Sequence, residues 1–501
     1  MCPIDASNGT APEALENGFS WNTPDSFDPP SEYDVYVWYL NHDEKRLTRS
    51  GELFSIPVFE GQRDIKSLPV FPIEYHDDQG LRQQLIDRGK KFVDLMKNPG
   101  LHEFTGPSML HGNRKYNRAR VLIDYTAEPW NTDSVLSRGG ITYIPVTGMG
   151  SIEPGDHIRF PKCPCQTCDD KEAQLTGVQR RMFEDYDEIV LKKTGTLTDH
   201  QYMLCPPLVY AVILRDNIWE LAEVDRLEPP RIQADLMDKL AMQPEANTLM
   251  LKAICEPPPA FAPDLVPGKG EGQIVLLHGP PGTGKTLTAE SVAEYTARPL
   301  LGLTAAQLRY SSQELEKNLQ VWLRLAKKWN AIVLVENADD YLETEGTQRA
   351  VILRALDYFQ GTLFLTTTAK HVEKFDRAVM SRIHVHIGFD PLDEPARQKI
   401  WTNHLDRLSH NKEMHGLEIQ VSDEAKEFVK RSTELQALKW NGHEIRNALQ
   451  TALALACSQA RREGKGVPEL TGEHLRQVAT MSQNFKNYLD RESAWLDYIY
   501  V

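Results

Sequence analysis

One eight-residue segment carries the clearest chemistry in the chain. GPPGTGKT fits the pattern G-x-x-x-x-G-K-[ST], follows the apolar run QIVLLH and precedes a helical pattern. Glycines let backbone N–H groups converge on phosphate oxygens, and the start of the helix adds a partial positive charge. Lys285 can reach the β- and γ-phosphates, and the Thr286 hydroxyl can bind Mg²⁺. The segment predicts a nucleotide-phosphate site made of Gly279, Pro280, Pro281, Gly282, Thr283, Gly284, Lys285 and Thr286.

A second cluster has side chains that could bind a metal. Cys163, Cys165 and Cys168 lie within six residues of KCPCQTCDD, and thiolates suit Zn²⁺. The C-x-C-x-x-C spacing lacks the paired C-x-x-C of strong zinc sites, and a fourth ligand would have to be His157 or Cys205. A zinc site is therefore one interpretation, and a reduced, solvent-facing cysteine loop is the better supported one.

Composition limits the class of protein. The 501 residues include 56 Lys+Arg and 71 Asp+Glu, a formal net charge of −15, whereas general binders of nucleic-acid backbones need a basic face. The charge therefore disfavours a nucleic-acid partner and leaves a local basic patch as the open alternative. Seven cysteines at low density and the lack of a secretory pattern at the N-terminus indicate an intracellular location, cytoplasmic or nuclear. No charge-free apolar run reaches the roughly 18 residues of a membrane span, so we expect no membrane segment.

The first half of the chain precedes the phosphate loop. Residues 1–32 are acidic and rich in Pro, Asn and Ser, which predicts a disordered tail. Residues 33–227 combine β-like runs with one amphipathic helix over 80–96, which predicts an α+β domain. The β-like runs are 34–40, 68–76, 119–125 and 140–146. A helical connector and a Pro/Gly-rich linker follow over 228–272.

The second half must position the phosphate loop. Residues 273–390 alternate continuous apolar strands with helices, a pattern typical of a parallel sheet with helices on both faces. The pattern is helical over 391–485, with N-caps expected at Ser422 and Thr471, and residues 486–501 form a C-terminal tail. The predicted fold class is an α/β core with a C-terminal helical lid, preceded by an α+β domain.

Several stretches together resemble a fungal branch of the AAA+ ATPases. They are LLHGPPGTGKTLTAESVAEYTARPL, IVLVENADDYLE, YFQGTLFLTTT, FDRAVMSRIHVHI, PLDEPARQKIW and NGHEIRNALQTALALA. PVFPIEYH, RGKKFVDL, ARVLIDY and LCPPLVYAVILRDNIWE resemble, more weakly, the uncharacterised N-terminal region that accompanies these ATPases. The resemblance implies a P-loop AAA+ core that uses ATP and Mg²⁺, and a ring oligomer, commonly a hexamer, with active sites between subunits. It also implies a protein substrate that the ring remodels.

The family pattern is broken where it places its catalytic acids. The third core strand normally ends in an Asp that acts through Mg²⁺ and a Glu that polarises the attacking water; here these positions hold Glu336 and Asn337. Glu336 keeps a negative charge for the metal. An amide can orient water but cannot accept its proton, and loss of a general base costs about 10²–10⁴ in rate. The missing general base could be replaced by the carboxylate of Asp339, Asp340 or Glu336 itself. If none of these acts as the base, ATP turnover is slow.

Four further positions follow from the resemblance. Thr368 stands where the family commonly has an Asn that orients water, although a residue that merely ends a strand is an equal alternative. Arg382 matches the arginine finger that acts on a neighbouring subunit, and Arg446 matches the lid arginine that senses nucleotide. Tyr310 loosely matches an aromatic pore residue, but a surface tyrosine is the favoured interpretation.

We therefore expect an intracellular AAA+ ATPase that couples ATP binding and slow hydrolysis to remodelling of a protein partner held by residues 33–227. The alternative is a hydrolysis-deficient, ATP-gated scaffold or regulatory subunit. Such a protein works by assembly, because a nucleotide that binds one assembly state better shifts the equilibrium toward it.

Overall fold

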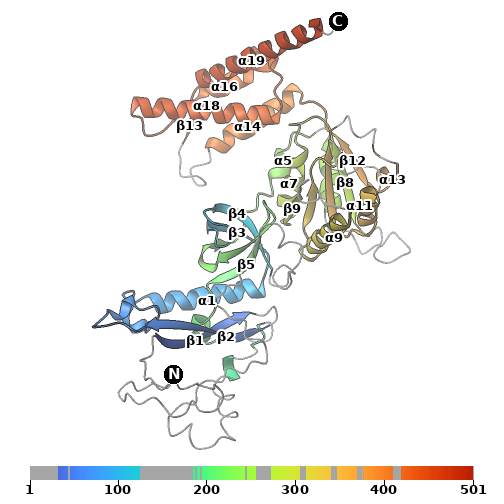
Figure 1. The fold of residues 1–501 in the computed structure, drawn as a ribbon. Coiled ribbons are helices and arrows are strands. Elements are labelled where there is room, and N and C mark those ends of the chain that lie inside the picture. Colours follow the sequence, from blue (N-terminus) through green and yellow to red (C-terminus); the bar gives the residue numbers. More distant parts are fainter. Residues whose placement is uncertain are drawn as a thin grey trace, which may run out of the picture. The chain divides into compact units, whose positions relative to one another are not determined.

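The computed structural model describes residues 32–42, 46–124, 184–186, 189–191, 195–242, 245–255, 272–304, 312–339, 347–368, 375, 377–409 and 419–499. The chain forms two compact units, Met1–Pro230 and Arg231–Val501 (Figure 1). Among the described residues, no helix combines the length and the apolar content needed to cross a membrane.

The N-terminal unit is built on antiparallel strands. β1 (Glu32–His42) pairs with β2 (Leu47–Pro57) in a hairpin. A separate five-stranded sheet has the order β6-β5-β4-β3-β7. Its strands are β3 (Leu101–Pro107), β4 (Lys115–Ile123), β5 (Leu208–Ile213), β6 (Ile218–Glu223) and β7 (Leu227–Glu228). The strands predicted over 34–40 and 119–125 are confirmed where residues are described, whereas 140–146 lies outside them.

Helix α1 (Leu81–Lys97) joins the hairpin and the sheet into one core. Its apolar face buries Phe92 and Val93 in a cluster with Leu40 of the hairpin and Val121 of the sheet, so the predicted helix is confirmed. The short helix α4 (Asp199–Met203) lies beside α1 and begins with a capping box at Thr198.

The β-like run predicted over 68–76 is wrong. These residues form turns, including a short 3₁₀ helix, Ile73–Tyr75, that follows Pro72. Proline lacks a backbone N–H, so Pro69 and Pro72 cannot donate to a strand ladder.

Gly89 sits where α1 approaches the backbone of α4. A Cβ at this position would lie 1.9 Å from the Tyr202 carbonyl oxygen, so the two elements would have to separate. We expect Gly89→Ala to lower the free energy of unfolding by about 3 kcal/mol, the upper end of ordinary overpacking costs. Urea unfolding measures this, with Gly100→Ala as the control because a Cβ there meets nothing within 4 Å. Equal stability of the two variants would contradict the close approach.

The C-terminal unit contains the predicted parallel sheet. Its strand order is β12-β8-β11-β10-β9, and every neighbouring pair is parallel. The strands are β8 (Gln273–His278), β9 (Leu300–Leu303), β10 (Ile332–Val335), β11 (Thr362–Thr367) and β12 (Val385–Gly388). The helices between them are α7 (Lys285–Tyr295), α9 (Ser312–Lys328), α11 (Thr347–Tyr358) and α13 (Arg377–Met380).

The two faces of the sheet are covered by different helices. In β10, Ile332 and Leu334 pack in the cluster that contains Val292 of α7. Val333 and Val335 point the opposite way, toward α9 and α11, because successive strand residues alternate between faces. Helices therefore cover both faces, as predicted, and the fold class is confirmed.

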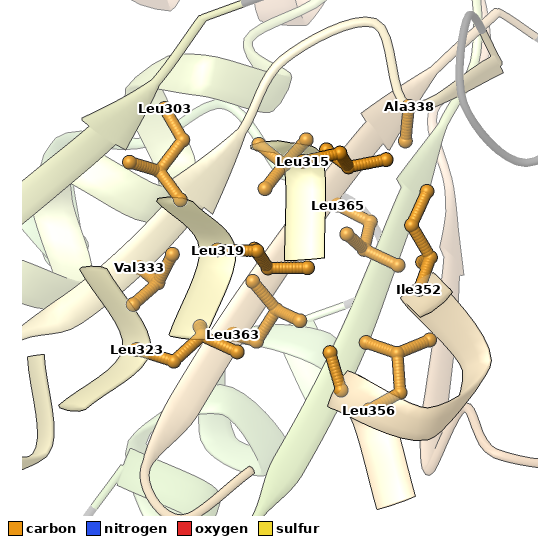
Figure 2. Close-up of a pocket in the computed structure, with 12 residues that line it drawn as sticks. Leu303, Leu315, Leu319, Leu323, Val333, Ala338, Ile352, Leu356, Leu363 and Leu365 are labelled. Atoms are coloured by element: carbon orange, nitrogen blue, oxygen red, sulfur yellow. The ribbon is translucent and has the colours of Figure 1, made fainter. Parts of the chain in front are cut away.

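An apolar cavity of about 40 Å³ lies between the sheet and the helices α9 and α11 (Figure 2). Leu315, Leu319 and Leu323 of α9 face strand side chains across it, and Ile352 and Leu356 close it from α11. Its lining contains no polar atom, so the cavity is a packing defect rather than a chemical site.

Ala355 of α11 also lines this cavity, which gives a test of its volume. We expect Ala355→Val to raise the free energy of unfolding by about 0.5–1 kcal/mol, because a side chain fills empty space. Ala452→Val is the matched helical control: Ala452 is fully buried in the lid, where added volume should cost about 1–3 kcal/mol. Thermal unfolding of both variants is the measurement, and loss of stability in Ala355→Val would argue that the cavity is filled in solution.

Helices follow the sheet and form the predicted lid. They are α14 (Glu394–Ser409), α16 (Asp423–Arg431), α17 (Thr433–Ala437), α18 (Gly442–Glu463) and α19 (Gly472–Ile499), with a two-strand pair of β13 (Gln420–Val421) and β14 (Glu469–Leu470). Ser422 caps α16 as predicted, since its side chain accepts from Ala425 N. Thr471 directly precedes α19, which continues through residues 486–499.

Two helices that precede the sheet in the chain contact both the core and the lid. α5 (Leu236–Lys239) and α6 (Glu245–Cys255) pack against α7, with Met237 and Leu251 buried. Lys399 of α14 donates to the Asp238 and Leu240 carbonyl oxygens at 3.1 and 2.6 Å. The same connector therefore contacts the helix after the phosphate loop and the first lid helix.

Candidate functional site

The phosphate loop links β8 to α7. Gly284 has φ +105° and precedes the first residue of α7, while its carbonyl oxygen accepts from Thr288 N at 2.9 Å. Such a φ is natural for glycine alone, and a Cβ there would meet nothing within 4 Å. The loop thus leads directly into a helix N-terminus, the arrangement that binds phosphate.

Lys285 folds back over the loop. Its Nζ donates to the carbonyl oxygens of Gly279 at 2.8 Å and Pro280 at 2.7 Å. Burial lowers the pKa of the Lys285 ammonium, and the negative charge of Asp339 partly opposes this effect. A half-buried cation held only by neutral carbonyls in this loop is suited to exchange them for phosphate oxygens.

Thr286 and Glu336 meet at the start of α7. The Thr286 hydroxyl donates to Glu336 Oε1 at 2.7 Å, although the two residues lie fifty positions apart. Glu336 follows the last residue of β10 and is exposed. A hydroxyl and a carboxylate are the hard oxygen ligands that Mg²⁺ prefers, so these two residues fit the metal that the sequence predicts for them.

Asn337 adopts a left-handed backbone conformation, with φ +52°. Asparagine tolerates this region better than most residues. Its backbone N–H donates to Thr366 Oγ1 at 3.3 Å, and the next residue, Ala338, donates to the Thr366 carbonyl oxygen at 2.8 Å. The exposed Asn337 side chain is thus carried by a turn fixed to β11.

Thr367, at the end of β11, contacts the site. The Thr367 hydroxyl donates to Asp339 Oδ1 at 2.9 Å, and its carbonyl oxygen accepts from Gly279 N at 3.3 Å. Thr368, the predicted water-orienting residue, is half-buried, and its carbonyl oxygen is 3.4 Å from the Thr367 hydroxyl. Sequence reasoning missed Thr367 because three consecutive threonines give no means of choosing among them.

Arg382 lies in the turn after α13 and is bound within its own chain. Its Nε and Nη2 donate to the two carboxylate oxygens of Asp357 at 2.6 and 2.9 Å, and its Nη1 donates to the Ala378 carbonyl oxygen at 2.6 Å. Asp357 lies near the end of α11. Nothing in the local sequence indicated this pair.

Arg446 lies on α18, one turn beyond its N-terminus, and its side chain is exposed. Desolvation and the charge of Glu336 raise the pKa of the Glu290 carboxyl on α7, while Arg446 opposes them. The positive charge of Arg446 therefore acts on Glu290 of the helix that follows the phosphate loop.

The lid touches the phosphate loop at Gly282. The Gly282 carbonyl oxygen accepts from Gly442 N at 2.8 Å, and a Cβ at Gly282, which has φ +75°, would lie 2.5 Å from Asn441 Oδ1. Asn441 caps α18 with a reciprocal Glu444 capping box. The start of the lid helix that carries Arg446 is thereby fixed against the loop.

Several predicted positions lie outside the described residues: Cys163, Cys165, Cys168, His157, Tyr310 and Asp340. The reduced cysteine loop and the surface tyrosine therefore stay predictions, as do their alternatives, a zinc site and a pore residue. Cys205 is described and buried, and desolvation raises the pKa of its thiol to about 12. Within the described ranges, no three His, Cys, Asp or Glu side chains are grouped closely enough to hold a metal ion.

Three family models match this chain. Residues 275–391 match the ATPase family associated with various cellular activities (AAA), residues 392–494 match the fungal AAA+ ATPase lid domain, and residues 11–77 match a domain of unknown function (DUF7025). The last match begins within the stretch predicted to be a disordered tail. The core and lid matches adjoin at the end of the parallel sheet.

Individual relatives are distant. Human ATPase family AAA domain-containing protein 3B is 28% identical over 150 residues, covering 28% of this chain and 23% of that protein. The 26S proteasome regulatory subunit 8 homolog of Encephalitozoon cuniculi is 27% identical over 173 residues, covering 31% of this chain and 44% of that protein. This chain thus spans less than half the length of these relatives.

A crystal structure of the FIGL-1 AAA domain aligns with a TM-score of 0.38 and 16% identity, over 52% of this chain and 91% of that one. The matches to the AAA core and to its lid agree with the parallel sheet, the phosphate loop and the helices that follow. The chain therefore belongs to the AAA+ ATPases, in the fungal branch that combines this core and lid with an N-terminal domain of unknown function.

Proposed function

We propose that this protein is a slow ATPase that works as a ring and uses ATP to rearrange a protein partner. The observation that carries the proposal is the meeting of three groups at one helix N-terminus: the Lys285 ammonium, the Thr286 hydroxyl and the Glu336 carboxylate. No other element of the described chain offers a cation and metal-binding oxygens at a phosphate-binding loop.

The residues present fit ATP and Mg²⁺. Lys285 would contact the β- and γ-phosphates, the loop N–H groups would bind their oxygens, and Thr286 and Glu336 would hold the metal directly or through water. Bound Mg²⁺ would neutralise charge that develops on the phosphate oxygens. The protein would supply position and electrostatic stabilisation, which dominate phosphoryl transfer.

Slow turnover follows from Asn337. Its amide can hold a water molecule by a hydrogen bond, but at neutral pH it takes no proton from that water. Asp339 is one of the described carboxylates beside this turn, with Glu336, and its Oδ1 accepts the Thr367 hydroxyl at 2.9 Å. We assign it the lesser role of orienting Thr367, because it lies two residues beyond the position of the family's base.

The proposed partners follow from the family. AAA+ proteins commonly form hexameric rings with active sites between subunits, and Arg382 would then act on the neighbouring subunit's ATP. The residues 33–227 would hold the protein substrate. An acidic net charge of −15 disfavours a nucleic-acid substrate.

An ATP-gated scaffold is the second candidate, and Asn337 favours it. The amide of Asn337 takes no proton from water at neutral pH, unlike the carboxylate of a catalytic glutamate. In that case ATP would favour one assembly state without being consumed.

Turnover measured against protein concentration tests the proposal. Active sites shared between subunits require assembly, so ATP turnover per subunit should rise with protein concentration until the oligomer is complete. Arg382→Ala should remove this rise while ATP binding persists. ATP binding and ATP-dependent assembly without turnover would support the scaffold, whereas failure to bind ATP would overturn both candidates.

A further inference from the structure

The Arg382–Asp357 pair combines two well-fixed groups at the edge of the core. The carboxylate meets the guanidinium through two hydrogen bonds, and the two side chains are only 28% and 25% exposed. An arginine on the helix that carries Asp357 differs: Arg354 of α11 lies 3.6 Å from Glu316 and is 73% exposed. Arg382 is therefore held in one orientation, whereas Arg354 is loosely paired.

The pairing leaves part of the guanidinium available. Arginine has five N–H donors, of which Asp357 takes one from Nε and one from Nη2, and the Ala378 carbonyl takes one from Nη1. In the described part of the chain, Nη1 and Nη2 thus each retain one N–H. These remaining N–H groups, one on each terminal nitrogen, are charged donors of the kind that bind phosphate oxygens.

Fixing this orientation in advance has a physical benefit. A free arginine side chain loses rotamer entropy when it is immobilised against a ligand, and one already held by a carboxylate loses less. The guanidinium also keeps its positive charge in this contact, because the Asp357 carboxylate raises the pKa of Arg382.

We propose that Asp357 is a positioning residue for Arg382: it holds the guanidinium so that its remaining N–H pair meets the γ-phosphate of ATP on a neighbouring subunit. This inference rests on the proposed function, in which Arg382 acts between subunits. Asp357 itself contacts neither ATP nor the reacting atoms.

Two kinds of subunit can separate this role from a structural one. A Lys285→Ala donor has Arg382 but a crippled phosphate loop, and an Arg382→Ala acceptor has an intact loop but no finger. Mixed together, they form productive sites only where a donor's arginine faces an acceptor's ATP. Asp357→Asn is then placed either in the donor or in the acceptor.

We expect Asp357→Asn in the donor to lower ATP turnover of the mixture by about 10- to 100-fold, since small misplacement of a catalytic group has effects of this size. In the acceptor, where no arginine remains to be positioned, turnover should change less than twofold. Asp357→Glu in the donor should restore part of the loss, because it keeps the carboxylate. Glu316→Ala in the donor is the matched control, because it removes the carboxylate near Arg354 and should have no effect.

ATP-dependent association gives a second readout that needs no hydrolysis. In sedimentation velocity with ATP, the Asp357→Asn donor should need a several-fold higher concentration to associate with the acceptor. Equal losses of turnover in the donor and acceptor positions would show a structural role and overturn the inference. Higher ATP turnover with Asp357→Asn in the donor would show that Asp357 restrains Arg382, and this result would also overturn the inference. If the unaltered mixture turned over no faster than its separate components, the proposed action between subunits would fail, and the positioning role with it.

Discussion

Lys285→Ala is expected to weaken ATP binding and nearly abolish turnover. The ammonium now bonds two loop carbonyl oxygens at 2.7 and 2.8 Å and would bond phosphate instead. Loss of hydrogen bonds from a charged donor costs about 1.5–3 kcal/mol, which is roughly 10- to 100-fold in affinity. Turnover should fall by a further factor of about 10²–10³, since charge grows on the transferred phosphate.

Calorimetry with ATP and a phosphate-release assay measure the two effects. Lys327→Ala, which removes an exposed lysine from α9, is the control and should change neither. Lys285→Ala should not lower the melting temperature of the ATP-free protein. Burial depresses the pKa of Lys285, so its charged form costs stability below that folded pKa, and removing the charge removes the cost. Unchanged ATP affinity in Lys285→Ala would contradict the proposed site.

Asn337→Glu is expected to accelerate turnover, by about 10²-fold if a general base is all that the site lacks. Part of the gain will be lost to the backbone. Asn337 has φ +52°, and a residue other than Gly, Asn or Asp in that region costs about 1–2 kcal/mol. The increase should therefore be nearer 10-fold than 10⁴-fold.

A matched control isolates the chemistry from the strain. Asn330 also has positive φ, +50°, in the turn after α9, so Asn330→Glu meets the same backbone cost away from the loop. It should lower the melting temperature about as much as Asn337→Glu and leave turnover unchanged. Wild-type turnover of about 1 s⁻¹ or more, near ordinary enzyme rates, would contradict the claim that Asn337 slows the reaction.

Most of the fold could be predicted from the sequence because the patterns that indicate it occupy consecutive residues. Apolar strands, a Gly-rich loop and amphipathic helices each occupy consecutive residues, and they predicted the parallel sheet and the lid. The exception at residues 68–76 arose from prolines, which fit an apolar run by composition but lack the N–H that a strand needs.

The site was predictable only in part, because its contacts join distant positions. The phosphate-loop pattern located Lys285 and Thr286, and the family resemblance located Glu336. No local pattern pairs Arg382 with Asp357, 25 residues earlier, or selects Thr367 from three adjacent threonines. Such choices depend on how strands align and helices end, which a single sequence does not specify.

Gly282 makes the shape of the phosphate loop depend on the lid. The phosphate-binding pattern leaves this position open, yet here glycine is required twice, by φ +75° and by the lid residue Asn441 that occupies the space of a Cβ. In this chain the glycine therefore serves the contact with the lid as well as the phosphate loop. A truncated chain that ends near residue 391 would keep every residue of the phosphate-binding pattern. It would still lose the hydrogen bond that the Gly442 N–H donates to the Gly282 carbonyl oxygen. Its loop would then be free to adopt other shapes, so nucleotide affinity measured on an isolated core would understate that of the whole chain.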